Sequence, residues 1–318
     1  MLIAKLNRSI AFLCGSMLIA AAGYCSTAIS ASTSIDIPIA LHGDRLFVQV
    51  NTSIGHITML IDTGSEATHI SEAAVKGKAV SIERKKTELI GIGDTGKRDA
   101  YGVIPLDIPF SEQIIFRTRA LVDNSIPEDG DFPYDGILGL DFFAANCVVL
   151  DAPQSRMEIL SKEECEADTS DTYTIPALWT RRAIFIPLKM KFLRTRRVVA
   201  SEATLDTGAG VSLMLPKEFR ADAGLSGTSQ TAAIVTATGV DGKVDADIVD
   251  GVMVRIEGSP VTFTGKTVIA RQRVRPHTSI FADPALRTEI LLGSGYIKLM
   301  KVKLDPVHRC LYVYKPAD

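Results

Sequence analysis

The stretch Leu60-Ile61-Asp62-Thr63-Gly64-Ser65 occurs a second time, slightly altered, as Thr204-Leu205-Asp206-Thr207-Gly208-Ala209. In each copy, apolar or β-branched residues lead into Asp-Thr-Gly, and a small residue follows. This pattern predicts an extended segment that carries a carboxylate to a tight turn, where Gly tolerates a positive φ. A single Asp-Thr-Gly would be ordinary turn chemistry. Two copies with matching surroundings indicate that the chain repeats one unit.

The sequence around each copy is repeated as well. An apolar pair followed by Gly stands downstream of both motifs, an Asp-ending segment follows it, and an Ile-Pro pair stands upstream. The matched segments are Ile137-Leu138-Gly139 with Leu291-Leu292-Gly293, Val149-Leu150-Asp151 with Lys303-Leu304-Asp305, and Ile37-Pro38 with Ile175-Pro176. The chain is therefore predicted to contain two copies of one unit of roughly 140 residues, a size typical of a duplicated domain.

These motifs resemble the signature of the aspartic protease family. The resemblance covers nearly all of the chain beyond its N-terminal segment, and the short, simple units look more like two fused retropepsin-type units than like pepsin. It implies a mostly β, bilobal aspartic-protease fold made of two similar β-barrel-like lobes with the active site between them. The expected boundaries are 32–160 for the N-terminal lobe, 161–174 for an acidic linker and 175–318 for the C-terminal lobe.

The resemblance implies that Asp62 and Asp206 form a catalytic dyad. Two nearby carboxyl groups cannot both ionise easily, so they share one proton, a case for which aspartic proteases are the standard example. The ionised carboxylate accepts a proton from water while the protonated one donates to the peptide carbonyl, so no metal or cofactor is needed. A third Asp-Thr-Gly begins at Asp94, but Gly93 precedes it and Lys97 follows it. Asp94 is therefore expected to be an exposed turn residue.

The resemblance also implies that residues beside the dyad support it. The two threonines should hydrogen-bond across the turns, and the glycines should keep the turns and the supporting segments free of Cβ atoms. These residues are Thr63, Gly64, Gly139, Thr207, Gly208 and Gly293. The next position differs between the copies, with Ser65 in one and Ala209 in the other. Because a hydroxyl can donate to a neighbouring carboxylate, we expect the two sides to be chemically unequal.

Two glycine-rich hairpins are predicted at similar offsets after the two motifs. The first contains Gly91 and Gly93, and the second contains Gly239 and Gly242. The resemblance implies flaps that close over substrate, two as in a retroviral dimer, whereas pepsin-type chains have one; the alternative is two ordinary hairpins. His69, seven residues after Asp62, either contacts substrate or titrates near the dyad, or is a half-buried strand histidine with no catalytic part.

Residues 1–31 are interpreted as a signal peptide. Lys5 and Arg8 are the only charges there, and the apolar segment from Ile10 to Gly23 has the length of a signal core rather than of a membrane span. Retention of the segment as an anchor, or lipidation at Cys25, remains the alternative. The signal predicts a periplasmic or secreted protein with no stable membrane insertion after cleavage.

Composition limits the remaining possibilities. The formal net charge is −2 and no basic tract occurs, so no nucleic-acid partner is expected. Cys147, Cys165 and Cys310 are the cysteines beyond the leader, which allows at most one internal disulfide and leaves one thiol. Their spacing is not that of a metal site. Cys147 and Cys310 are interpreted as buried structural thiols.

The sequence thus predicts an aspartic endopeptidase that acts on a peptide or protein substrate as a monomer, because each lobe supplies one Asp. Two rival hypotheses stay open. One is a non-catalytic peptide-binding module on the same fold, which would bind peptides without cleaving them. The other is a membrane-tethered processing protease for one specific protein.

Overall fold

The computed structural model of the chain divides into two compact units, Met1–Ser32 and Thr33–Asp318. The structure describes residues 34–84, 87–89, 98–100, 102–126, 132–167, 170–225, 234–239, 242–271 and 290–315. The predicted signal peptide, Gly91, Gly93 and Asp94 lie outside the described residues. The second unit contains both predicted lobes, and the described residues include no helix that is long and apolar enough to cross a membrane.

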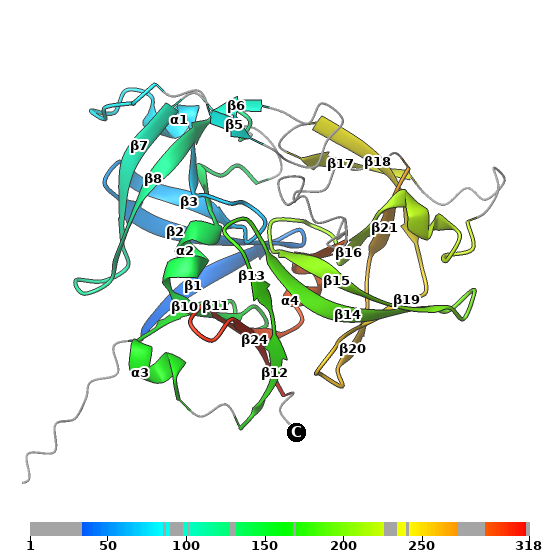
Figure 1. Ribbon diagram of the computed structural model, residues 1–318. Helices are drawn as coiled ribbons and strands as arrows, with labels where there is room; N and C mark the ends of the chain where they lie inside the picture. The colour runs from blue at the N-terminus through cyan, green and yellow to red at the C-terminus, as the bar shows by residue number, and fades with distance from the viewer. Residues whose placement is uncertain are drawn as a thin grey trace, which may run out of the picture. The chain divides into compact units, whose positions relative to one another are not determined.

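Strands make up most of the regular secondary structure in the first half of the second unit, as the sequence predicts (Figure 1). Its elements are β1 (Ile35–His42), β2 (Arg45–Thr52), β3 (Gly55–Ile61), β4 (His69–Ser71), α1 (Glu72–Val75), β5 (Thr87–Leu89), β6 (Arg98–Ala100), β7 (Gly102–Pro109), β8 (Ile115–Asp123), β9 (Gly136–Leu138), α2 (Leu140–Ala145), β10 (Cys147–Asp151), β11 (Arg156–Leu160) and α3 (Lys162–Cys165).

The second half repeats this order with small differences. Its elements are β12 (Thr172–Pro176), β13 (Leu178–Trp179), β14 (Ile184–Phe192), β15 (Val198–Asp206), β16 (Leu213–Leu215), the 3₁₀ helix η1 (Lys217–Arg220), β17 (Ile234–Gly239), β18 (Gly242–Val249), β19 (Val252–Ile256), β20 (Thr262–Thr264), β21 (Thr267–Ala270), β22 (Leu291–Gly293), α4 (Ser294–Ile297), β23 (Lys301–Asp305) and β24 (Cys310–Tyr314).

Strand pairing confirms the internal duplication. In the first lobe β3 pairs with β9 in parallel, β9 pairs with β4 antiparallel, and β4 pairs with β8 in parallel. The second lobe repeats this pattern with β15, β22, β16 and β21. Parallel partners come from distant parts of the chain. The same exchange of partners in both lobes therefore places each Asp-Thr-Gly turn at an equivalent point.

Local sequence explains where the strands turn. Gly43, between β1 and β2, has a φ of 60°, a conformation that Gly adopts without strain. Ser71 caps α1 by accepting a hydrogen bond from the Ala74 amide, and Lys76 is the residue that follows the end of the short helix. Along β7 the apolar residues Ile104, Leu106 and Ile108 face the core because side chains alternate across a strand.

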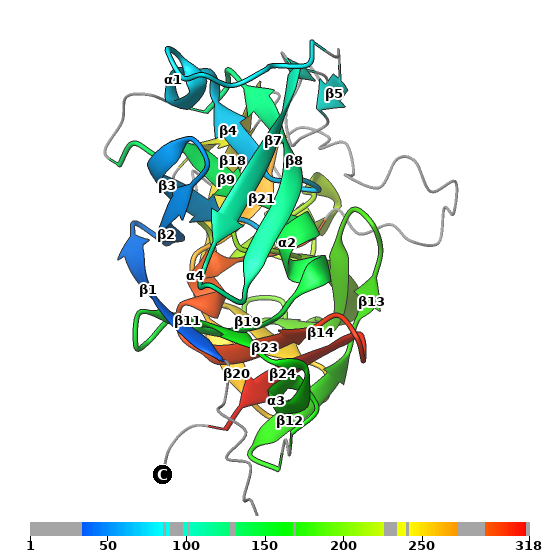
Figure 2. The ribbon, with the colours of Figure 1, turned by 90° about the vertical axis from the view of Figure 1, so that its left-hand side faces the viewer.

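One sheet joins the two lobes. Its strands run in the order β12-β24-β23-β10-β11-β1 before the sheet continues into the first lobe, and β10 pairs antiparallel with β23. Figure 2 shows β11, β23, β24 and β12 together, with β23 and β24 coloured red near the end of the chain. The final strands of the second lobe therefore share a sheet with strands of the first lobe.

The acidic linker contains more order than its composition indicates. Ser161 begins α3 with a capping box: its hydroxyl accepts from the Glu164 amide, and the Glu164 carboxylate accepts from the Ser161 amide. Cys165 at the end of α3 forms a disulfide with Cys147 of β10. This bond attaches the linker to the shared sheet. Cys310 is the free cysteine among the described residues, and it is partly exposed rather than fully buried.

Candidate active site

The two Asp-Thr-Gly turns follow equivalent strands. Asp62 comes directly after β3, and its amide donates to the carbonyl of Leu138 in the parallel neighbour β9 at 3.1 Å. Asp206 is the last residue of β15 and lies opposite Gly293 of the parallel neighbour β22. The supporting glycine segments thus run beside the candidate catalytic turns, as the resemblance implies.

Each aspartate is held by the amides of its own turn. Oδ1 of Asp62 accepts from the Gly64 amide at 2.8 Å and from the Ser65 amide at 3.2 Å. Oδ1 of Asp206 accepts from the amides of Gly208 and Ala209, at 3.1 and 3.0 Å. Hydrogen bonds from backbone amides orient a carboxylate and favour its charged form.

The two threonines form four reciprocal hydrogen bonds across the turns. The Thr63 amide donates to Thr207 Oγ1 at 3.0 Å, and the Thr207 amide donates to Thr63 Oγ1 at 3.2 Å. Each hydroxyl then donates to a carbonyl of the opposite lobe, Thr63 to Leu205 and Thr207 to Ile61, both at 2.8 Å. Both threonines are fully buried. Every polar atom of this link has a partner, so the spacing of the two turns is rigidly set.

The turn glycines are required by the opposite lobe. A Cβ atom on Gly64 would lie 2.5 Å from Cγ of Asp206, and a Cβ on Gly208 would lie 2.3 Å from Cγ of Asp62. Each glycine therefore lies against the carboxyl group of the other lobe, and no side chain fits between them. The sequence predicts freedom from Cβ crowding here, and the structure identifies the crowding group as the partner carboxylate.

The electrostatics of Asp206 reflect its burial. Its side chain is 7% exposed, and burial raises the pKa of Asp206 although a hydrogen bond with Asp62, the amides of Ala209 and Gly208, and the charge of Arg45 all act to lower it. Asp62 is half-buried. Two hydrogen-bonded carboxyl groups of this kind titrate as a pair, so the shared proton belongs to both.

The supporting glycines are closely packed. A Cβ on Gly139 would lie 2.2 Å from the Ala67 carbonyl oxygen, and one on Gly293 would lie 2.1 Å from the Val211 carbonyl oxygen. Leu140, which follows Gly139, is hydrogen-bonded to the first catalytic turn: its amide donates to the Ser65 carbonyl at 2.7 Å. These contacts explain why an apolar pair must be followed by Gly in both units.

Ser65 does not act as the sequence suggested. Its hydroxyl donates to the carbonyl of Ala67 at 2.9 Å, and it is the backbone amide of Ser65 that donates to the Asp62 carboxylate. A hydroxyl carries a single proton, so this bond uses it within the loop. Ser65 and Ala209 therefore present the same amide donor to the dyad, and the inequality of the two sides has another source.

His69 is buried, rather than half-buried or placed against substrate. It is 5% exposed, and its Nδ1 lies 3.0 Å from Oδ2 of Asp123, which is 1% exposed. The amide and hydroxyl of Ser125 also donate to Asp123, both at 2.7 Å. His69 therefore belongs to an interior polar cluster between β4 and β8, which corrects the expectation of substrate contact.

Both predicted hairpins are present. β5 pairs with β6 from Thr87 opposite Ala100 to Leu89 opposite Arg98, and its tip lies outside the described residues. β17 pairs with β18, and Gly239 lies opposite Gly242, with residues 240–241 outside the described part of the chain. The positions are equivalent in the two lobes, and their part in closing over substrate stays a prediction.

Two residues beside the dyad have no counterpart in the sequence motifs. The charge of Arg45, at the start of β2, lowers the pKa of Asp206. The pKa of Tyr134 is raised, mainly by burial and in addition by the nearby charge of Asp62. Tyr134 packs on Phe47, with ring centroids 5.7 Å apart. In the sequence, Tyr134 could have been noticed because it stands shortly before the repeated segment Ile137-Leu138-Gly139. Arg45 stands outside every repeated segment.

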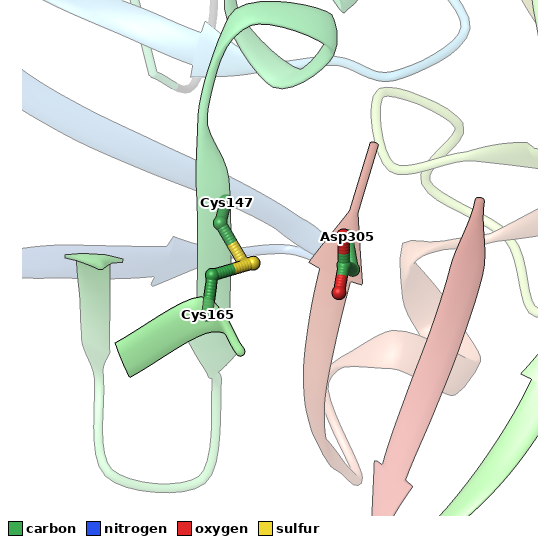
Figure 3. Close-up of side chains that lie close together, drawn as sticks. All are labelled: Cys147, Cys165 and Asp305. Atoms are coloured by element: carbon green, nitrogen blue, oxygen red, sulfur yellow. A yellow bond between two sulfur atoms is a disulfide. The ribbon is translucent and has the colours of Figure 1, made fainter. Parts of the chain in front are cut away.

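One group of possible metal ligands lies within the described residues. Cys147, Cys165 and Asp305 have ligand atoms within 4.8 Å of one another, and all three are buried. The two sulfur atoms are bonded to each other, as the yellow bond in Figure 3 shows, so they are not thiolate ligands. This group is a structural cross-link beside a carboxylate.

Comparisons with known proteins agree with this architecture. No family model matches the chain, and no curated protein matches its sequence. The chain is similar to the crystal structure of an aspartic proteinase from Irpex lacteus, with a TM-score of 0.57, 11% identity, and coverage of 89% of this chain and 98% of that one. It is also similar to basic 7S globulin from soybean, with a TM-score of 0.50, 10% identity, and coverage of 90% and 96%.

The fold is therefore the bilobal aspartic-protease fold, mostly β, with two similar lobes. At these low identities the likeness to solved structures shows the fold alone. One neighbour is described as a proteinase and the other as a globulin, so the activity of this chain has to be argued from its own residues.

Proposed function

We propose that the protein is an aspartic endopeptidase that hydrolyses peptide bonds with a water activated by Asp62 and Asp206. The observation that carries the proposal is the paired turn: the two carboxyl groups share a hydrogen bond, and the reciprocal threonine bonds hold their spacing. In aspartic proteases this arrangement keeps one proton between two carboxyl groups.

The proposed reaction needs only that proton. The ionised carboxyl group of the dyad accepts a proton from the attacking water, and the protonated one donates to the carbonyl oxygen, giving a tetrahedral diol. The proton then moves to the leaving nitrogen as the C–N bond breaks. Burial of Asp206 favours its neutral form, which supports retention of one proton when the other group is charged.

The equivalent hairpins support a further part of the proposal. β5–β6 and β17–β18 follow the two candidate turns at matching points, and either could cover an extended peptide bound by backbone hydrogen bonds. Closure would exclude water other than the nucleophile. Two such hairpins would make the enzyme retropepsin-like.

We also infer that the protein acts as a monomer in the periplasm or outside the cell, after removal of residues 1–31. Support comes from the charge and apolar pattern of that segment and from the presence of both aspartates in one chain. Activity measured against protein concentration, together with light scattering, tests the monomer: specific activity should stay constant on dilution.

The activity is tested by incubating the mature protein with a peptide library, with and without a statine-type inhibitor. We expect cleavage that the inhibitor blocks. Asp62→Asn and Asp206→Asn should each reduce the rate roughly a hundredfold or more, the scale of general acid–base catalysis. Asp94→Asn should leave the rate nearly unchanged. Peptide binding without cleavage by the unaltered protein would instead favour the peptide-binding module.

A further inference from the structure

The turn between β1 and β2 reaches across to the second lobe. The Ser294 hydroxyl lies within hydrogen-bonding distance of the Asp44 carbonyl oxygen, and Lys298 Nζ lies 2.5 Å from Oδ1 of Asp44. Both partners belong to α4 or its end. Asp44 is therefore fixed to the second lobe, and the next residue, Arg45, begins β2 beside the candidate site.

The side chain of Arg45 extends over the second catalytic turn. A Cβ atom on Gly210 would lie 3.2 Å from Nε of Arg45 and 3.6 Å from its Cγ. The charge of Arg45 lowers the pKa of Asp206 and that of Tyr134, although burial raises both pKa values by more. A guanidinium of the first lobe thus lies against Gly210 of the second lobe, near enough to Asp206 for its charge to lower the pKa of that carboxyl group.

Within the described part of the chain, no carboxylate forms an ion pair with Arg45. The nearest acidic residue in sequence, Asp44, is occupied by Lys298. The Arg45 side chain is half-buried. A guanidinium that has lost part of its hydration and has no acidic partner gains from a carboxylate that fits its planar donors.

The duplication shows that this arrangement is specific to one side. Phe47 lies opposite Leu60, two residues before Asp62, and Phe185 lies opposite Thr204, two residues before Asp206. Arg45 therefore corresponds to Ala183, which is buried.

The loop residues in contact also differ. Four residues after the Asp, the first lobe has Glu66 and the second has Gly210. The carboxylate of Glu66 forms an ion pair with a cation of the opposite lobe, since Arg182 Nε lies 3.4 Å from Oε1 of Glu66. On the Arg45 side the loop offers only Gly210. One cross-lobe cation is therefore neutralised by the protein itself, and the other is left for a ligand.

We propose that Arg45 binds an acidic side chain of the peptide substrate beside the scissile bond, and so sets a preference for Glu or Asp there. The proposal deepens the proposed function and rests on it for the orientation of the peptide. The position of Arg45 on one side only makes the preference directional along the bound peptide.

The test measures binding rather than cleavage. Reduced-amide peptides, which cannot be hydrolysed, are made in pairs with Glu or Gln at each position around the reduced bond, all with amidated C-termini. Binding is measured by fluorescence anisotropy at low and high salt. At one position we expect the Glu peptide to bind about tenfold more tightly than its Gln partner, with a smaller ratio at high salt.

Three variants locate the source of that preference. Arg45→Met should abolish it and leave affinity for the Gln peptide nearly unchanged, and Arg45→Lys should retain part of it. Arg182→Met is the matched control, because it removes a cross-lobe cation that Glu66 already pairs, and should keep the preference. Circular dichroism and thermal unfolding confirm that each variant is folded.

Several results would overturn the proposal. They are equal binding of Glu and Gln peptides at every position, a preference that survives Arg45→Met, and no binding of any peptide. A preference seen only for a peptide with a free C-terminal carboxylate would refute the acidic side chain as the group recognised. Cleavable versions of the same peptides are tested in parallel, so failure of hydrolysis refutes the proposed function separately from the binding comparison.

Discussion

Two buried aspartates show how neighbouring donors decide the charge of a carboxyl group. At Asp123 burial raises the pKa, but hydrogen bonds from His69 and Ser125 outweigh it, and the pKa of Asp123 is lowered. At Asp206 burial prevails and the pKa is raised, although backbone amides and Asp62 oppose it. Burial is the largest single effect at both residues; the imidazole and Ser125 outweigh it at Asp123, whereas the backbone amides, Asp62 and Arg45 do not outweigh it at Asp206.

Asp123→Asn should destabilise the protein at neutral pH by about 3 kcal/mol, because it breaks a buried, hydrogen-bonded pair. A carboxyl group with a lowered pKa in the folded state contributes stability above its unfolded pKa of about 3.9 and loses it as pH falls through the folded value. The difference between the variant and the unaltered protein should therefore shrink in acid.

Chemical unfolding over a range of pH measures this effect. Asp107→Asn is the control, because its ion pair with Arg117 is exposed on both sides and should change stability by less than about 1 kcal/mol. A difference for Asp123→Asn that stays constant across pH would show that the charge of Asp123 does not stabilise the fold.

At the scale of elements, the site depends on turns that follow equivalent strands. β3 and β15 each deliver an Asp-Thr-Gly turn, and the parallel neighbours β9 and β22 support it. The reciprocal threonine bonds cross between these two halves of the molecule. Each turn therefore depends on the opposite lobe for its hydrogen bonds and for the space its glycine occupies.

Thr207→Val should cost about 1–3 kcal/mol of unfolding free energy. The change keeps the volume of the side chain but leaves the Ile61 carbonyl and the Thr63 amide without partners. Activity should fall as well, since the spacing of the dyad loses two of its four bonds. Thr264→Val on the exposed edge strand β20 is the control, and equal Tm changes in both variants would contradict the prediction.

Gly239→Val should lower kcat/KM several-fold with little change in Tm. A β-branched side chain at the end of β17 restricts the backbone where the strand ends, and a lid needs freedom there. Gly258→Val is the matched control: φ is 93° at this turn after β19, so Tm should fall while kcat/KM of the folded fraction is kept. If Gly239→Val has no effect on turnover, β17–β18 is a surface hairpin rather than a flap.

At the scale of the whole molecule, one sheet joins the two lobes, and one disulfide fixes the linker to that sheet. β23 of the second lobe pairs with β10 of the first lobe, and β24 pairs with β23. The Cys147–Cys165 disulfide fixes α3 of the linker to β10. Lys303 of β23 adds a buried hydrogen bond from its Nζ to the Cys165 carbonyl at 2.9 Å. The boundary between the lobes in sequence is therefore not a boundary in the sheet.

Replacing both Cys147 and Cys165 by Ser should lower the free energy of unfolding by about 3 kcal/mol, as expected for a disulfide that closes a loop of 18 residues. Thermal unfolding with and without a reductant measures it. Reduction should bring the unaltered protein to the Tm of the double variant and leave the variant itself unchanged. Cys310→Ser should have little effect, and reductant sensitivity in the double variant would contradict the assigned pairing.

The sequence by itself determined the features that repeat locally. Each Asp-Thr-Gly, each apolar pair before Gly and the Gly-rich hairpins are short-range patterns of turn chemistry and strand alternation. Their duplication was enough to predict two mostly β lobes and the need for Gly64 and Gly208, and the resemblance to a known family implied the roles of Thr63 and Thr207. A turn or a strand is favoured by its own residues, so such features can be recognised without knowing their neighbours.

Only the tertiary structure decided which distant residues meet. The pairing of Cys147 with Cys165, the burial of His69 against Asp123 and the place of Arg45 against Gly210 all join segments with no shared local pattern. Such contacts depend on the packing of whole sheets, which bring together strands far apart in the chain. For this reason the symmetric part of the candidate site could be predicted from sequence, whereas the source of its asymmetry, which the sequence assigned to Ser65, appeared only when the two lobes were packed together.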